Sequence, residues 1–98
     1  PFSIREEIRI MTYQHLSANG AYQLQTGRGM LHSVVISSKG TGSETIHIYD
    51  GTDATGHMMA DIDAHSNQIA LAYDVQFEHG LHVVLDGGGA PDVTITFM

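Results

Sequence analysis

Two carboxylates and an imidazole stand at alternate positions near the middle of this 98-residue chain, in Asp61, Asp63 and His65. On an extended strand these three side chains would point to one face, because successive side chains alternate between the two faces. Carboxylate oxygens and imidazole nitrogens bind divalent cations, so the cluster could act as a metal-dependent switch. The alternative is the solvated face of an edge strand, where acidic side chains prevent pairing with other chains. We favour the edge strand because the spacing matches no recognised metal-binding motif.

Histidine is frequent, with seven in the chain. Three of them, His32, His47 and His82, fall within expected strands, and across a sheet they could form a metal site or a pH sensor. The alternative is that each is a half-buried side chain with one hydrogen bond. Because spacing along the chain does not show which strands are neighbours, we predict no metal site and no bound cofactor.

Two glycine-containing segments resemble ligand-binding loops only in part. Residues 50–56 interleave acids and glycines, but they lack the ligand order and the final glutamate of a calcium loop. Residues 87–89 are three glycines, but no Lys-Ser/Thr follows, and Pro91 and an expected strand come next instead of a helix N-terminus. We predict that both segments are turns.

Groups for covalent catalysis are also missing. The chain has no cysteine, so it has no disulfide and no thiolate nucleophile, and its serines follow no G-x-S-x-G pattern. A pair of catalytic carboxylates can be drawn from the eleven acidic residues, but a sandwich of this size has little room for a deep pocket. We therefore predict that the protein is not an enzyme.

The elements that position these residues are short and extended. Two-residue alternation of apolar and polar side chains recurs, as in 45–49, 81–85 and 93–97, and turn-forming clusters separate such runs. The pattern predicts eight strands, at about 8–15, 21–26, 30–38, 44–50, 57–63, 69–77, 81–86 and 92–98. It predicts an all-β fold made of a single antiparallel β-sandwich, either jelly-roll or immunoglobulin-like. One domain would cover residues 1–98, with residues 1–9 as a short N-terminal arm.

Charge is divided unevenly along the chain, whose formal net charge is −7. All four Lys and Arg residues lie in the first 39 positions, whereas residues 40–98 contain nine Asp and Glu and no Lys or Arg. Because so acidic a body repels phosphate backbones, nucleic acid is not an expected partner. No apolar run is long enough to span a membrane, and charged residues occupy the place of a secretory signal's apolar stretch, so we expect synthesis in a cytoplasm.

The N-terminal arm combines apolar and basic side chains, namely Phe2, Ile4, Arg5, Ile8 and Arg9. A small monomer rarely leaves several large apolar side chains near one end in water. We therefore expect these five residues to contact another subunit or a larger partner, and we expect the chain to form a homo-oligomer.

Residues 31–98 carry a pattern of strands and turns that resembles small virion proteins of tailed bacteriophages. The matching pieces are Val-Val-Ile at 34–36, Gly-Thr-Gly-Ser at 40–43, Ile-His-Ile-Tyr-Asp-Gly-Thr at 46–52, Phe77 to Gly80 followed by Leu-His-Val-Val at 81–84, and Gly-Gly-Ala-Pro-Asp-Val-Thr-Ile-Thr-Phe at 88–97. These proteins are β-sandwich decoration, or cement, proteins on the outside of capsids. The resemblance implies a homotrimeric structural protein on the virion exterior. It would bind the major capsid protein, with the arm as the capsid contact, and stabilise the shell.

A function of another class is a glycan- or receptor-binding module on a phage tail or capsid spike. Sandwich lectins usually stack aromatic rings on sugars. The chain has no Trp, and most of its four Tyr and three Phe fall within expected strands. This composition disfavours glycan binding, and capsid decoration stays the favoured interpretation.

Overall fold

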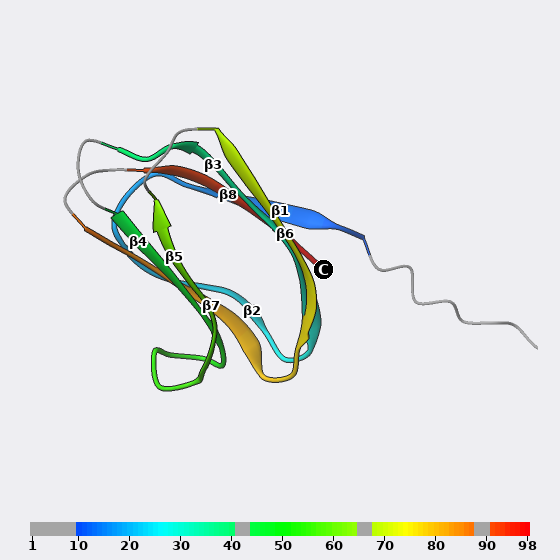
Figure 1. Cartoon of the computed structure of the whole chain (residues 1–98). Helices are drawn as coiled ribbons and strands as arrows, with labels where there is room; N and C mark the ends of the chain where they lie inside the picture. Colours follow the sequence, from blue (N-terminus) through cyan, green and yellow to red (C-terminus); the bar gives the residue numbers. More distant parts are fainter. Residues whose placement is uncertain (1–9, 41–43, 65–67, 88–90) are drawn as a thin grey trace, which may run out of the picture.

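The computed structural model describes residues 10–40, 44–64, 68–87 and 91–98, which form strands joined by turns (Figure 1). The strands are β1 (Thr12–Leu16), β2 (Gly20–Thr26), β3 (Gly29–Ser38), β4 (Glu44–Asp50), β5 (His57–Ala64), β6 (Ile69–Phe77), β7 (Gly80–Gly87) and β8 (Asp92–Phe97). None of the described residues belongs to a helix that is long and apolar enough to cross a membrane.

The strands form two four-stranded antiparallel sheets that enclose the core between them (Figure 1). Sheet A has the order β1-β8-β3-β6, and sheet B has the order β2-β7-β4-β5. Pairs join β1 to β8, β2 to β7, β3 to β6 and β4 to β5, so the chain folds like a long hairpin rolled into two layers. This topology confirms the predicted all-β sandwich and is the jelly-roll of the two predicted alternatives.

The core follows from the alternation of apolar residues along each strand. In β8, Val93, Ile95 and Phe97 are buried, whereas the intervening Thr94 and Thr96 are only partly covered. The same alternation in β3, β4, β5 and β7 supplies the rest of a continuous apolar cluster between the sheets. Because a strand presents alternate side chains to opposite faces, each sheet has a second, outward face whose residues are free to make contacts outside the chain.

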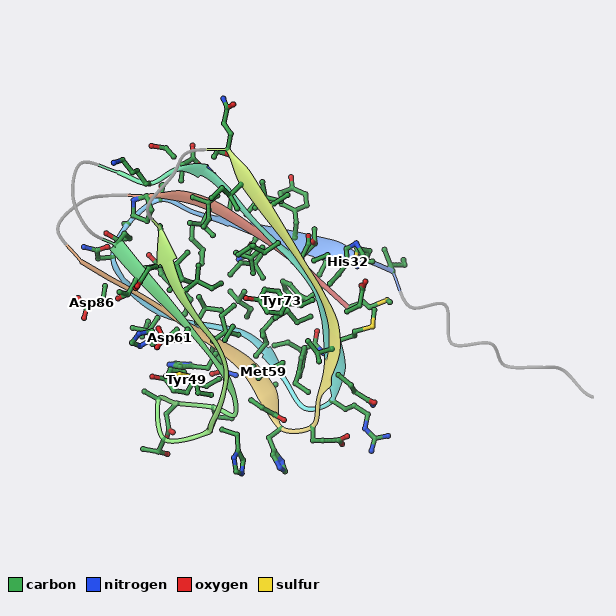
Figure 2. All side chains as sticks on the ribbon, viewed as in Figure 1. His32, Tyr49, Met59, Asp61, Tyr73 and Asp86 are labelled. Atoms are coloured by element: carbon green, nitrogen blue, oxygen red, sulfur yellow. The ribbon has the colours of Figure 1, made fainter. Side chains whose placement is uncertain are left out.

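Two edge strands contribute larger side chains to the side of the core. Met59 of β5 and Tyr73 of β6 are half-buried and pack against the apolar cluster, and Figure 2 shows both between the two sheets. Burial raises the pKa of the Tyr73 hydroxyl above 10.0, because the charged form loses its hydration. Met59 is the extra residue of an irregularity in the β4–β5 pairing, which turns its side chain inward beside the exposed Met58.

The first strand begins later than predicted, at Thr12, and it ends at Leu16. Thr12 pairs with Phe97, the last residue of β8, so Ile10 and Met11 have no partner residue on that strand. Ile10 and Met11 are accordingly outside the strands and exposed, at 76% and 41%. The predicted arm, residues 1–9, lies outside the described residues.

Asp50 joins the end of β4 to the loop between β6 and β7. Its carboxylate accepts hydrogen bonds from the backbone N–H groups of Glu78, His79 and Gly80, at 2.7 to 3.4 Å. These residues connect β6 of sheet A to β7 of sheet B. Residues 50–56 therefore form the predicted turn, in which Asp53 also accepts hydrogen bonds from the backbone N–H and hydroxyl of Thr55.

Candidate functional site

The outward face of sheet B carries the main concentration of exposed carboxylates. Asp61 and Asp63 lie on the edge strand β5, and Asp86 lies near the end of β7; all three are exposed. Thr45 of the intervening β4 pairs with both Asp63 and Asp86, so these carboxylates lie on either side of it. We call Asp61, Asp63 and Asp86, with Thr45 and His47 between them, the acidic face. Figure 2 shows Asp61 and Asp86 on the side of sheet B that points away from sheet A.

Spacing on the acidic face follows from strand geometry. Alternate residues of one strand are about 7 Å apart, which sets the distance from Asp61 to Asp63. Residues two strands apart are separated by about 10 Å, which sets the distance from Asp63 to Asp86. No Lys or Arg lies in any strand of sheet B, and among the strand residues His47 of β4 contacts Asp61.

A row of polar rings continues from the acidic face across the sheet. His47 Nε2 lies 3.1 Å from Asp61 Oδ1, and the Tyr49 hydroxyl lies 3.5 Å from His47 Nδ1. The ring of Tyr49 lies 6.3 Å from that of His47 and 6.3 Å from that of His82. His82 is 9% exposed and its Nδ1 lies 2.7 Å from Oε1 of Gln23. The row orients His47 beside Asp61 and continues through the buried Tyr49 and His82 to Gln23 of the edge strand β2.

The outward face of sheet A is different in character. Its transverse rows are Tyr13–Thr96–Ser33–Ala72 and His15–Thr94–Val35–Ala70. Two carboxylates border it: Asp92 contacts His15 across β1 and β8, and Asp74 lies 2.5 Å from Nδ1 of His32 across β3 and β6. Nothing in this face parallels the group of three carboxylates on sheet B.

The contact between His32 and Asp74 depends on a bulge. The register of β3 and β6 shifts between Leu31 and Ser33, where Tyr73 and Asp74 stand opposite the single residue His32. Asp74 takes a φ of 49°, in the left-handed region that Asp tolerates better than most residues. The bulge brings the Asp74 carboxylate to the histidine ring.

The histidine cluster that the sequence analysis considered and did not favour is not formed. His47 and His82 lie on sheet B, whereas His32 lies on sheet A, on the other side of the core. Asp61 and Asp63 do share the exposed face of an edge strand, as the solvated-strand interpretation predicts, and His65 lies outside the described residues. Among the residues placed by the structure, no group of three His, Asp or Glu side chains could hold a metal ion.

Sequence reasoning did not find Asp86, Tyr49 or Tyr13. The alternation in 44–50 and 81–86 shows which residues share a face, but the face becomes a site only when β4 is known to lie between β5 and β7. The predicted interface residues Phe2, Ile4, Arg5, Ile8 and Arg9 lie outside the described residues, so their assignment stays a prediction.

No protein-family model matches the sequence, and no curated protein matches it. Among solved structures, the chain is similar to the core of the Drosophila protein NLP, a nucleoplasmin-like β-sandwich whose structure was described with regard to pentamer formation and histone binding. The two chains are 15% identical, the match covers 92% of this chain and 97% of the NLP core, and the TM-score is 0.59. At 15% identity, this similarity shows that the two chains share a fold.

This comparison contradicts the expected resemblance to phage virion proteins, since the matching fold belongs to a histone-binding animal protein. The expectations that followed from it are wrong as well: capsid decoration, a trimer, a major capsid protein as partner and a place on the virion. The alternative of a glycan- or receptor-binding phage module has no support either. The physical reason is that the matching pieces, such as residues 46–52, are alternating strands and glycine turns, which β-sandwiches of many functions need.

Proposed function

We propose that this protein is a non-enzymatic binding protein that holds basic protein segments on its acidic face, as a chaperone for such partners. The observation that carries the proposal is the placement of Asp61, Asp63 and Asp86 together on the outward face of a sheet whose strands contain no Lys or Arg. The likeness to the NLP core, which is described as histone-binding, supports the same class of partner.

The geometry favours an extended partner. Alternate side chains of an extended chain lie about 7 Å apart on one face, which equals the expected separation of Asp61 and Asp63. A segment with Lys or Arg at alternate positions would therefore place two cations over these carboxylates and reach Asp86 with a third. Exposed ion pairs contribute about 0.2–1 kcal/mol each, so several must act together and salt must weaken the binding.

Fluorescence anisotropy with a labelled peptide of alternating Lys and Ser tests this function, with purified histones as a second ligand. The triple variant Asp61→Asn/Asp63→Asn/Asp86→Asn should bind about tenfold more weakly, from the loss of about three exposed pairs. The matched control Asp53→Asn/Asp74→Asn/Asp92→Asn removes the same charge elsewhere and should bind the short peptide within about twofold of the natural chain.

Two results would contradict the proposal. Equal weakening in both triple variants would mean that net charge alone attracts the peptide, without a defined face. An absence of binding to both ligands at about 50 mM salt, where screening is weak, would exclude the function itself.

A further inference from the structure

We infer that the outward face of sheet A is the surface through which copies of this chain associate. We call this surface the assembly face, and its residues lie on all four strands of the sheet: Tyr13, Ser33, Val35, Ala70, Ala72, Thr94 and Thr96. The inference goes beyond the proposed function, which uses the opposite sheet.

The middle of the assembly face consists of small and medium-sized side chains, and the hydroxyls of Ser33 and Thr96 there already have hydrogen-bond partners. Val35 and Thr94 are neighbours in one row, and Ser33 and Thr96 are neighbours in the next. The hydroxyls of Ser33 and Thr96 are hydrogen-bonded to each other, and the Thr96 hydroxyl also lies 3.4 Å from the Ser33 carbonyl oxygen. Covering these groups therefore does not leave them without hydrogen bonds, which would otherwise oppose association.

Large apolar side chains extend this surface at the β1 edge. Tyr13 is 66% exposed, and Met11 and Ile10 precede it at 41% and 76%. Tyr13 lies in the same row as Thr96, Ser33 and Ala72, so its ring borders the small residues of the inner strands. Exposed large apolar side chains of this kind are typical of surfaces that a partner covers.

Charge indicates that the partner is another copy. Chains with a net charge of −7 repel each other, and the acidic face would concentrate that repulsion. The titratable groups at the assembly face are the Tyr13 hydroxyl, two carboxylates and two imidazoles, and each carboxylate is in contact with a histidine: Asp92 with His15 and Asp74 with His32. This face therefore allows two copies to approach without placing unpartnered carboxylates together, and it lacks the charge that would recruit a strongly basic or acidic macromolecule.

Light scattering after size-exclusion chromatography tests this inference with a matched pair of variants. Ala72 and Ala21 are both exposed alanines on edge strands, β6 of sheet A and β2 of sheet B. The natural chain should have at least twice its single-chain mass of 10.6 kDa. Ala72→Glu should raise the dissociation constant of assembly about tenfold or more by burying a charge at the contact, whereas Ala21→Glu should leave it unchanged. Far-UV circular dichroism verifies that both variants keep their strands.

A thiol-labelling experiment covers the case in which Ala72→Glu does not fold. The chain has no cysteine, so Ala72→Cys and Ala21→Cys each introduce a unique thiol. The thiol of the Ala72→Cys variant should react more slowly with a maleimide at high protein concentration than at low concentration, and that of the Ala21→Cys variant should react at one rate. A monomeric natural chain at about 100 μM, equal assembly of both Glu variants, or a concentration-independent rate for Ala72→Cys would overturn the inference.

Discussion

The Asp50 carboxylate holds the loop that connects β6 of sheet A to β7 of sheet B. Burial raises the pKa of Asp50, but hydrogen bonds from the backbone N–H groups of Glu78, His79 and Gly80 lower it by more, so the pKa lies below 3.8. A carboxyl group whose pKa is lower in the folded state stabilises that state above its unfolded pKa. The stabilisation is lost as the pH falls through the folded-state pKa.

Asp50→Asn should therefore destabilise the fold at pH 7 by about 1–2 kcal/mol, because an uncharged acceptor replaces one that three donors share. Urea unfolding measures the free energy at pH 7 and near pH 3. The difference between the variant and the natural chain should shrink at the lower pH, where Asp50 of the unfolded chain becomes protonated and part of the stabilisation is lost. Asp86→Asn, an exposed change on the same sheet, should alter the free energy little. An Asp50→Asn effect of equal size at both pH values would show that the charge does not matter.

At the scale of strands, the sequence predicts positions well and partners poorly. The segments 44–50 and 69–77 have the predicted bounds, because alternation and flanking turns are local signals. The pairing of β3 with β8, and the bulge that brings Asp74 to His32, depend on contacts between residues far apart in sequence. For the same reason the acidic residues of β5 could be assigned to an exposed edge, but their approach to Asp86 could not be predicted.

We propose that the N-terminal arm, residues 1–9, makes contacts between subunits. Phe2, Ile4, Ile8 and Ile10 occupy even positions, a pattern that suits one face of an extended chain. The described pairing of β1 begins at Thr12, so a shortened chain that begins at Ile10 keeps every pair with β8.

Removing residues 1–9 should therefore change the unfolding temperature of a dissociated chain by no more than a few degrees, because no strand pairing is lost. It should also weaken self-association, because apolar contacts between subunits are lost. Calorimetry and sedimentation measure the two effects. Unchanged association in the shortened chain would contradict the role of the arm, and a large fall in unfolding temperature would show that the arm belongs to the folded core.

At the scale of the whole molecule, the outward face of sheet A is assigned to assembly and the outward face of sheet B to binding. The core between them separates the acidic face on sheet B from the assembly face on sheet A, so association through one need not cover the other. An assembly would then present several acidic faces at once. Linked sites engage a long basic partner more tightly than a single site does, since later contacts form within one complex.

The Ala72→Glu variant separates binding by a single acidic face from the additional affinity that several linked faces provide. The short basic peptide reaches one acidic face, so its affinity per chain should stay within about twofold of that of the natural chain. A longer basic protein such as a histone bridges several faces, so its affinity should fall about tenfold or more when the assembly dissociates. Titration of both ligands at equal chain concentration measures the two effects, with Ala21→Glu as the control that retains both affinities. A parallel loss for the peptide and the long ligand would show that the faces are coupled through the core and contradict this division.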